Sequence, residues 1–375
     1  MNRFPVLHLF DQPINLNSRY FRAIGERHDH QRFPVTFVLV DDGFDRAEAA
    51  ARLGAPVQTL GVNSRWLYPL AILRLAKIAR AANAAFVHGH FFYPTIMGLG
   101  GARLAGCRFV FTRHHSDHHT RIGKRWHTRV DALCANWSDQ AVAVSEETRR
   151  LMIEVEGVDA RRVTTVYNGM EPLLAPTSAA VEALKRELGI AHDRVVLMIG
   201  RLHEEKGHRY LFDALPRVLK EVGPLTVVIA GDGVERSRLE ADVVGRGLGS
   251  VVRFVGWRLE IPELITLSSL VVLPSLAESF GFAVLEAMSL GRPVVAAATG
   301  GLREVIEDEK NGLLVPPRDS GALAEAMIRV LRDPGLTARL GAAGRESAAV
   351  FSFERMMSGY ESVYSACLRQ VPRVR

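Results

Sequence analysis

Two glutamates stand eight residues apart in the segment Glu278-Ser-Phe-Gly-Phe-Ala-Val-Leu-Glu286. An apolar run precedes this segment and a glycine and a second apolar run follow it. The pattern predicts strand, loop, helix and strand, with the helix starting near Gly281. Unpaired backbone N–H groups at a helix start attract anions, and carboxylates accept hydrogen bonds from hydroxyls. The segment therefore suits a ligand with a phosphate centre and hydroxyl-rich ends, such as a sugar nucleotide.

A second charged segment follows the predicted strand at residues 195–199. The run Gly200-Arg-Leu-His-Glu-Glu-Lys-Gly207 ends this strand, carries the cations Arg201 and Lys206, and leads into a helix. Cations just beyond the carboxyl end of a parallel strand are well placed for phosphate oxygens. Arginine binds such oxygens as a planar fork and lysine as a point charge. This loop is the second part of the predicted anion site.

Together the two segments resemble the retaining GT-B glycosyltransferases, in particular family 4, which contains sucrose synthases and bacterial mannosyl- and glucosyltransferases. The matching motifs occur in the expected order along the chain: Tyr167-Asn-Gly169, Gly200–Gly207, Ile229-Ala-Gly-Asp-Gly233, Glu278–Glu286 and Gly300-Gly-Leu-Arg-Glu304. The resemblance implies an α/β fold with two Rossmann-like domains that face each other across a cleft. We expect the acceptor domain at residues 1–170, the nucleotide-sugar domain at 171–350, and a last helix within 351–375 that packs back on the first domain.

The resemblance also implies the roles of the residues in the two segments. Arg201 and Lys206 would stabilise the charge that grows on the leaving diphosphate, and both count as catalytic candidates with Glu278. Glu278 is assigned to the hydroxyls of the donor sugar and Glu286 to the ribose hydroxyls. Glu278 is not predicted to be a covalent nucleophile, because retaining hydrolases use two carboxylates about 5 Å apart, whereas this pair flanks a phosphate site. The predicted donor-binding residues are Gly200, Arg201, Lys206, Gly256, Glu278, Ser279, Phe280, Gly281, Phe282 and Glu286.

In the first half, a histidine follows the predicted strand at residues 109–112. By resemblance His114 contacts the sugar and is the fourth catalytic candidate, although a shift of one residue would put His115 in its place. The loop after the first strand lacks the glycine pair usual in this family. Asparagine tolerates left-handed backbone conformations and an arginine can replace a missing phosphate contact. The predicted acceptor-binding residues are accordingly Asn17, Arg19, His90 and His115.

The histidines allow an alternative. The set at 114, 115, 118 and 119, with His88 and His90, could hold Zn²⁺, but no neighbouring cysteine or histidine–carboxylate pair completes it. The chain also lacks an Asp-x-Asp motif that would hold a metal at the diphosphate. We therefore predict no metal and no cofactor other than the nucleotide diphosphate sugar that serves as donor, a UDP-sugar or GDP-mannose.

Length and composition agree with two soluble α/β domains. The chain has 375 residues, of which 48% are hydrophobic and 23% charged. Strand-like apolar runs alternate with amphipathic segments almost throughout, which predicts parallel sheets covered by helices. No run is long enough to span a bilayer, no signal peptide is evident, and the three cysteines form no C-x-x-C pair. These features predict a cytoplasmic protein with reduced thiols.

The positive charge is concentrated in the first half. Residues 1–170 hold 22 Lys and Arg against 15 Asp and Glu, whereas the rest holds 25 against 26. Seven basic residues and one acid lie between Arg103 and Arg129, next to Trp126. This segment could rest on an anionic membrane surface as a peripheral contact, or it could be an ordinary solvated face. No recognition helix, RNP motif or zinc finger is present, so nucleic acid is not an expected partner.

The sequence thus predicts a retaining, metal-independent hexosyltransferase that uses a nucleotide diphosphate sugar. Its expected acceptor is a glycan or a lipid-linked glycoconjugate of the cell envelope, as in polysaccharide, lipopolysaccharide or glycolipid synthesis. Two alternatives stay open at this point. One is a nucleotide-sugar epimerase of the same fold, and the other is an inactive sugar-nucleotide-binding scaffold in which the altered first loop has abolished transfer.

Overall fold

The computed structural model describes residues 2–11, 18–114 and 125–370. These residues form two compact units, each built on one parallel β-sheet. The first unit consists of the described residues up to Met170 and those from Phe351 onward, and the second of Glu171–Val350. The predicted acceptor residues Asn17 and His115 lie outside the described residues.

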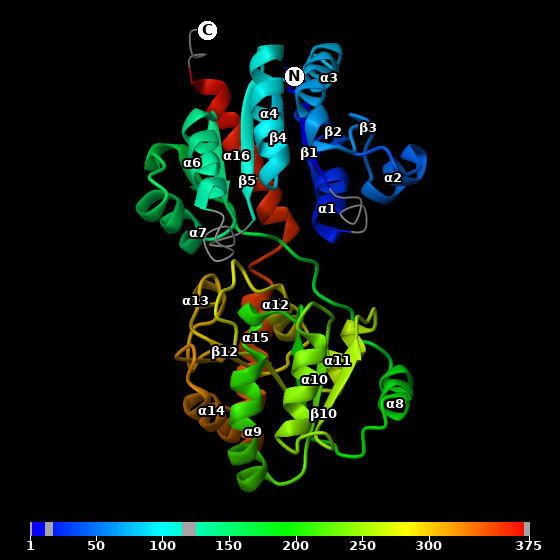
Figure 1. The fold of residues 1–375 in the computed structure, drawn as a ribbon, viewed down its shortest axis with the longest axis vertical. Coiled ribbons are helices and arrows are strands. Elements are labelled where there is room, and N and C mark those ends of the chain that lie inside the picture. The colour runs from blue at the N-terminus through cyan, green and yellow to red at the C-terminus, as the bar shows by residue number, and fades with distance from the viewer. Residues whose placement is uncertain (1, 12–17, 115–124, 371–375) are drawn as a thin grey trace. The chain divides into compact units, whose positions relative to one another are not determined.

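The first unit contains a seven-stranded sheet with helices on both faces (Figure 1). Its elements are β1 (Val6–Phe10), α1 (Arg19–Arg27), β2 (Val35–Leu39), α2 (Arg46–Leu53), β3 (Val57–Thr59), α3 (Tyr68–Ala81), β4 (Phe86–His90), α4 (Phe92–Ala105), β5 (Arg108–Arg113), α6 (Arg125–Trp137), β6 (Gln140–Ala143), α7 (Glu146–Arg150), β7 (Val163–Thr165) and α16 (Phe353–Arg369).

The second unit contains a six-stranded sheet of the same kind. Its elements are α8 (Ser178–Glu187), β8 (Val195–Ile199), α9 (His208–Val222), β9 (Thr226–Ala230), α10 (Arg236–Gly245), β10 (Val252–Gly256), α11 (Ile261–Leu267), β11 (Leu270–Leu273), α12 (Phe282–Ser289), β12 (Val294–Ala297), α13 (Leu302–Val305), β13 (Leu313–Val315), α14 (Ser320–Arg332) and α15 (Pro334–Ala348).

The strand order of each sheet locates its binding edge. The first sheet has the order β3-β2-β1-β4-β5-β6-β7 and the second β10-β9-β8-β11-β12-β13, with every pairing parallel. The chain direction across the sheet therefore reverses between β1 and β4 and between β8 and β11. In doubly wound sheets, ligands bind beyond the carboxyl ends of the two strands at this switch point. Arg201 and Lys206 follow β8 and Glu278 follows β11, so the candidate donor residues lie at the switch point of the second sheet.

The last helix, α16, is part of the first unit. Its buried aromatic residues Tyr360 and Tyr364 pack with Phe21 of α1 and Phe86 of β4 in one apolar cluster. This cluster covers one face of the sheet, while α3, α4 and α6 cover the other (Figure 1). Burying two large aromatic side chains stabilises this contact by several kcal/mol, at about 25 cal/mol per Å² of apolar area. The helix is thereby a structural element of the sheet that carries His88, His90 and His114.

The chain leaves and re-enters the first unit at adjacent points. Met170 forms an isolated parallel bridge with Ser352, and its N–H donates to the carbonyl oxygen of Phe351 over 2.9 Å. A Cβ atom at position 169 would lie 2.6 Å from the Phe353 Cα atom, so only glycine allows this approach. The Asn-Gly pair before Met170 thus has a packing reason as well as a family precedent.

The predicted fold class is confirmed, including nearly all strands. The three-residue edge strands β3 and β7 were not predicted. Among the described residues, no helix is long and apolar enough to cross a membrane.

Candidate functional site

The loop after β8 carries the two predicted phosphate cations, and each is paired with a carboxylate. The Arg201 guanidinium donates to Glu205 over 2.5 Å, and the Lys206 ammonium donates to Glu278 over 2.5 Å. The arginine side chain is 65% exposed, whereas the side chains of Lys206 and Glu278 are 15% and 16% exposed. Lys206 therefore links the loop after β8 to the loop after β11, across the switch point.

Two close backbone contacts hold the loop after β8 in place. Gly207 has φ +71°, and a Cβ atom there would lie 2.0 Å from the carbonyl oxygen of Pro274, just after β11. The N–H of Leu276 donates to the carbonyl oxygen of Glu205 over 2.7 Å. Because these contacts join the two loops through the backbone, the position of Lys206 relative to Glu278 does not depend on the ion pair alone.

The glycine pair after β12 supports the loop that carries Glu278. Gly300 has φ +49°, and a Cβ atom there would lie 1.9 Å from the carbonyl oxygen of Glu278. The N–H of Gly301 donates to that same oxygen over 2.9 Å. A side chain at Gly300 would displace the Glu278 backbone, and a side chain at Gly301 would displace the backbone of Ser279 and Phe280. These close contacts give the Gly-Gly motif a physical reason.

Helix α12 begins where the sequence predicts. Gly281 precedes it with φ +98°, and no side chain caps its first turn. Its first N–H groups thus lack intrahelical partners, as at any helix start. Ser279 lies in the same loop and Phe280 is buried, whereas Phe282 is 42% exposed. Glu286 lies in the second turn and is half-buried.

The two remaining donor candidates are glycines at the carboxyl ends of strands. Gly200 directly follows β8, and its N–H donates to the carbonyl oxygen of Ala230 over 3.0 Å. Gly256 ends β10 with φ +71°, and its carbonyl oxygen accepts from the N–H of Gly231 over 2.8 Å. Both lie on the edge of the sheet where the charged loops emerge. The structure thus gathers all ten predicted donor residues along one edge of the second unit.

In the first unit, His114 follows β5 and is half-buried. Its Nε2 atom lies 3.1 Å from Nδ1 of His90, and its ring packs on that of Phe91 with centroids 4.8 Å apart. Phe91 has φ +68° and ψ 175°, a conformation that costs a non-glycine residue about 1–3 kcal/mol and that recurs at functional sites. Burial lowers the pKa of His114 to about 3, so this imidazole is neutral at physiological pH.

The predicted acceptor residues have different positions. Arg19 is the exposed first residue of α1. His90 is fully buried, and its two ring nitrogens contact His8 over 2.9 Å and His114 over 3.1 Å. Direct contact of His90 with an acceptor would require these hydrogen bonds to break. In this structure His90 is instead a buried hydrogen-bond partner of His114.

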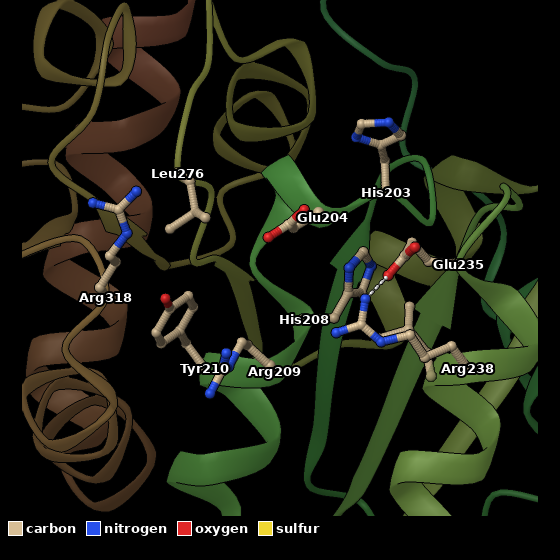
Figure 2. Close-up of a pocket in the computed structure, with 10 residues that line it drawn as sticks. His203, Glu204, His208, Arg209, Tyr210, Glu235, Arg238, Leu276 and Arg318 are labelled. Carbon is tan, nitrogen blue, oxygen red and sulfur yellow. Dashed lines mark hydrogen bonds and ion pairs between the residues drawn. The ribbon is translucent and has the colours of Figure 1, made fainter. Parts of the chain in front are cut away.

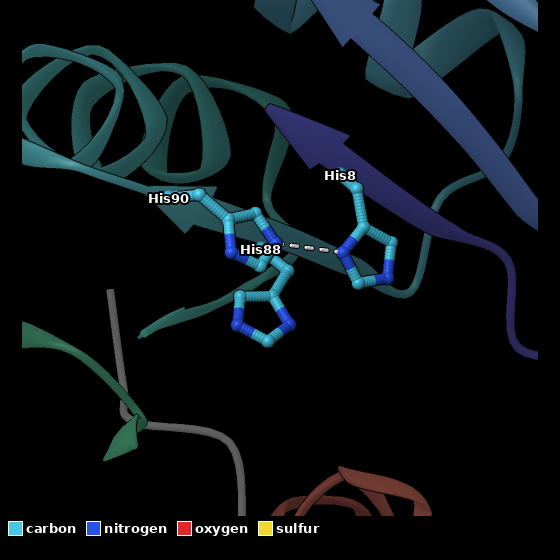
Figure 3. Close-up of side chains that lie close together, drawn as sticks. All are labelled: His8, His88 and His90. Atoms are coloured by element: carbon cyan, nitrogen blue, oxygen red, sulfur yellow. Dashed lines mark hydrogen bonds between the residues drawn. The ribbon is translucent and has the colours of Figure 1, made fainter. Parts of the chain in front are cut away.

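Three buried histidines, His8, His88 and His90, bring one nitrogen each within 4.8 Å of the others (Figure 3). They do not fit a metal site. The rings of His88 and His90 are stacked at 16° and those of His8 and His90 at 18°, so their in-plane lone pairs do not converge on one point. Each of their ring nitrogens already contacts a hydrogen-bonding group within 3.4 Å or less.

A separate pocket of about 110 Å³ lies beside the same loop, shown in Figure 2. It is lined by side chains from the loop, from the starts of α9 and α10, and from two further loops: His203, Glu204, His208, Arg209, Tyr210, Glu235, Arg238, Leu239, Leu276 and Arg318. None of the predicted donor residues lines it. We therefore do not identify this pocket with the donor site.

Sequence reasoning missed the polar residues beneath His114. His8, His88 and Thr112 are polar side chains inside otherwise apolar, fully buried parallel strands, and Tyr20 and Tyr360 meet them from α1 and α16. A polar residue within such a strand needs a buried partner, and this was the available signal. The main partners could not be named, because the tyrosines of α16 that hydrogen-bond Thr112 and His88 lie more than 200 positions further along the chain.

Comparison with known proteins agrees with this fold. The family model "Glycosyl transferases group 1" matches residues 181–347, and the model "Glycosyltransferase Family 4" matches residues 18–172. The alpha-D-kanosaminyltransferase of Streptomyces kanamyceticus is 33% identical over 288 residues, which cover 72% of this chain and 74% of that protein. A D-inositol 3-phosphate glycosyltransferase of Kribbella flavida is 33% identical over 76% of this chain and 72% of its own length.

Solved structures show the same fold. The HepE protein of Anabaena, in complex with UDP and glucose, superposes with a TM-score of 0.83 at 24% identity, over 96% of this chain and 99% of that one. A sucrose-phosphate synthase of Thermosynechococcus elongatus superposes with a TM-score of 0.79 at 22% identity, over 98% and 99% of the two chains.

Proposed function

This chain belongs to the glycosyl transferases of group 1, with the GT-B fold of glycosyltransferase family 4, and we propose that it moves a hexose from a UDP-sugar to its acceptor with retention of the anomeric configuration. The observation that carries the proposal is the Lys206–Glu278 contact at the switch point of the second sheet. In this proposal, Lys206 is the cation for the diphosphate and Glu278, in contact with it, is the carboxylate for the sugar hydroxyls. UDP as the nucleotide draws support from the HepE structures, which contain UDP, UDP and glucose, or UDP-glucose.

Charge development in the reaction explains why such a site would work without a metal. Breaking the bond between the anomeric carbon and the phosphate leaves negative charge on the diphosphate. Lys206, Arg201 and the start of α12 would provide fixed positive charge at that position. Donor binding would draw Lys206 from Glu278 toward the phosphate and leave the carboxylate to accept hydrogen bonds from the sugar. Glu278 would thus act by positioning, while the leaving oxygen assists deprotonation of the acceptor on the same face.

The two alternatives are less well supported. An epimerase would release a nucleotide-sugar intermediate and need no acceptor, yet the curated relatives compared above are transferases. In a scaffold without activity, Lys206 and Glu278 would not need to be held in contact. Here two close backbone contacts hold their loops, one at Gly207 and one at Gly300. We further propose that His114 contacts the donor sugar or the acceptor hydroxyl, with Arg19 as a second contact for the acceptor.

A donor screen in the presence of excess chelator tests the proposal. We expect turnover of one nucleotide diphosphate sugar, with a UDP-hexose as first candidate, and an unchanged rate when EDTA is added, because the protein's own cations act at the diphosphate. The readout is release of the nucleotide diphosphate, together with the anomeric configuration of the product by NMR.

Three results would count against it. If EDTA abolishes turnover and Mn²⁺, Mg²⁺ or Zn²⁺ restores it, the site needs a metal. An inverted product excludes the retaining mechanism. If the protein binds a nucleotide sugar, seen as a raised melting temperature, but neither transfers nor hydrolyses it, the result supports the inactive scaffold.

A lipid-linked envelope acceptor is proposed from the surface of α6. Trp126, Leu133 and Trp137 are 56%, 55% and 56% exposed and, with the exposed Arg129, form a stripe along one side of this helix. The Arg103 side chain donates to the Trp137 carbonyl oxygen over 2.8 Å, so the exposed end of α4 adjoins this stripe. Exposed tryptophans beside cations are suited to the headgroup layer of an anionic membrane.

Binding to vesicles tests this membrane contact. We expect binding to increase with the content of anionic lipid and to decrease in high salt, because each surface cation contributes about 1 kcal/mol that salt screens. A variant of the basic segment should be released from vesicles while it retains its donor affinity; its substitutions are Arg121→Gln, Lys124→Gln, Arg125→Gln and Arg129→Gln.

The matched control removes four exposed cations from the second unit, which should leave vesicle binding intact; they are Lys220, Arg253, Lys310 and Arg339. Equal loss in both variants would mean that total charge alone matters. A wild-type protein that ignores anionic vesicles at low salt would make the stripe an ordinary solvated face and favour a soluble acceptor.

A further inference from the structure

Eight polar side chains of the first unit form one chain of contacts beneath His114. They come from β1, α1, β4, β5, the residue after β5, and α16, and Figure 3 shows the three at the centre. In order they are His114, His90, His8, Tyr364, His88, Thr112, Tyr360 and Tyr20. The successive distances are 3.1, 2.9, 3.4, 2.5, 2.8, 3.1 and 2.5 Å. His8 and Tyr364, which form the longest contact, stand 356 positions apart.

The four imidazoles of this chain are neutral. Burial lowers the pKa of His8, His88 and His90 well below the ordinary value, and that of His114 to about 3. No carboxylate is a member of the chain. Each ring therefore carries one N–H and one lone pair, just as each hydroxyl carries one proton.

A count of protons restricts their arrangement. Eight groups offer eight protons, and seven contacts use one proton each. If an interior group pointed its proton out of the chain, a buried donor would lose its acceptor, at a cost of about 1–3 kcal/mol. The protons therefore follow one direction along the whole chain, and the surplus proton is at one of its two ends.

The two ends differ in their surroundings. Tyr20 is buried, and among the described residues its hydroxyl has one hydrogen bond, to Tyr360; the hydroxyl of Thr112 nearby already contacts both His88 and Tyr360. His114 is half-buried, and its Nδ1 atom has no hydrogen-bond partner in the described part of the chain. A proton on Nδ1 can meet water or a ligand, whereas a surplus proton at Tyr20 would have only the Thr112 oxygen to accept it, as a third partner of that hydroxyl.

We infer that the network holds His114 in the Nδ1–H tautomer, so that it presents a hydrogen-bond donor to the site, and that Tyr364 and Tyr360 of α16 are the positioning residues that impose this state. The same direction gives His8, His88 and His90 the Nδ1–H tautomer as well. The use of this donor toward a sugar or acceptor oxygen rests on the proposed function, whereas the tautomer itself does not. An imidazole in this state cannot take a proton from an acceptor hydroxyl unless every proton of the chain moves.

The tautomers can be read directly by NMR. The full-length protein, labelled with ¹⁵N-histidine and free of ligand, gives two-bond ¹H–¹⁵N correlations in which a protonated and a bare ring nitrogen differ in shift. The His114 signals are assigned with His114→Asn. We expect four rings in the Nδ1–H form at neutral pH. If all four rings are in the Nε2–H form, His114 presents an acceptor to the site and the inference is wrong. If the four rings differ in tautomer, the protons do not follow one direction along the chain of contacts, and the inference is wrong for that reason.

A conservative variant tests the positioning role. Tyr364→Phe removes the hydroxyl between His8 and His88 and leaves one nitrogen of His8 unpaired in either tautomer. The network then no longer favours one tautomer of His114, and the His114 signals should move to the average of the Nδ1–H and Nε2–H tautomers. Tyr93→Phe changes a tyrosine of α4 outside the network and should reproduce the wild-type spectrum. A His114 that keeps one pure tautomer in Tyr364→Phe would show that α16 does not set it.

The spectrum separates this inference from the proposed function. If the protein turns over a nucleotide sugar while His114 is in the Nε2–H tautomer, the inference is wrong and the proposed function still stands. Absence of turnover with every donor, in a protein whose four rings are Nδ1–H, would overturn the proposed function and leave the inference intact.

Discussion

Replacing Lys206 by alanine is expected to lower kcat at least about 100-fold, as found when fixed transition-state charge is removed from an enzyme site. Lys206 is 15% exposed and contacts Glu278, so its charge acts in a partly dry environment where screening is weak. Arg201→Ala should change kcat in the same direction by a similar factor. The measurement is steady-state turnover of the donor found in the screen, with kcat and KM determined separately.

The ion pair adds an expectation for stability. In Lys206→Ala the Glu278 carboxylate loses its cation, but at 16% exposure it can still reach water, so the melting temperature should fall by only a few degrees. Lys185→Ala is the matched control, because Lys185 also pairs with a carboxylate, Asp193, over 2.7 Å. It should leave kcat unchanged. Near-normal turnover in both Lys206→Ala and Arg201→Ala would remove these residues from the mechanism.

The melting temperature of the first unit is expected to fall steeply as pH decreases from about 7.5 to about 5. Five of its histidines, four of them buried and one half-buried, have lowered pKa values: His8, His28, His88, His90 and His114. In the unfolded chain they take up protons near the ordinary value of 6.5, whereas in the folded state they resist until far lower pH. Their stabilisation is therefore fully present above pH 6.5 and is lost as pH falls toward the folded values.

The pKa shift of a single histidine indicates how much stability is lost on acidification. Burial lowers the pKa of His28 to about 4, which corresponds to roughly 2 kcal/mol of stability lost between pH 7.5 and pH 5. Three carboxyl groups act in the opposite sense. Burial raises the pKa of Asp11 and of Asp131 to about 6 and also raises that of Glu156, which favours the folded state in acid. Five histidines against these three groups leave a net loss. In the second unit, burial lowers the pKa of His208 to about 4.

Scanning calorimetry across this pH range checks the prediction. His28→Phe keeps a ring against Tyr364 and removes one titrating group, so its melting temperature should depend less on pH than that of the wild type. His192→Gln changes an exposed histidine and serves as the control. A melting profile that stays flat down to about pH 5 would mean that the buried histidines accept protons without unfolding.

The sequence by itself determined the class of fold, and it predicted the donor residues. Apolar runs such as residues 195–199 and 270–273 can only be buried parallel strands between helices, and both occur with the same bounds in the structure. The start of α12 after Gly281 was also predicted, because a glycine before a helical pattern is a local signal. These features depend on neighbours in the chain, which is why local patterns sufficed.

Only the tertiary structure decided which side chains meet. Lys206 and Glu278 are 72 positions apart, and their contact depends on β8 and β11 being neighbours in the sheet. His88 was visible as a polar residue in a buried strand, but its partner Tyr364 arrives on α16 from 276 positions away. Pairing over such distances is set by strand order and by the packing of α16 on the sheet, neither of which leaves a periodic signal in the sequence. The chemical state of His114 therefore follows from the packing of the last helix rather than from the residues around it.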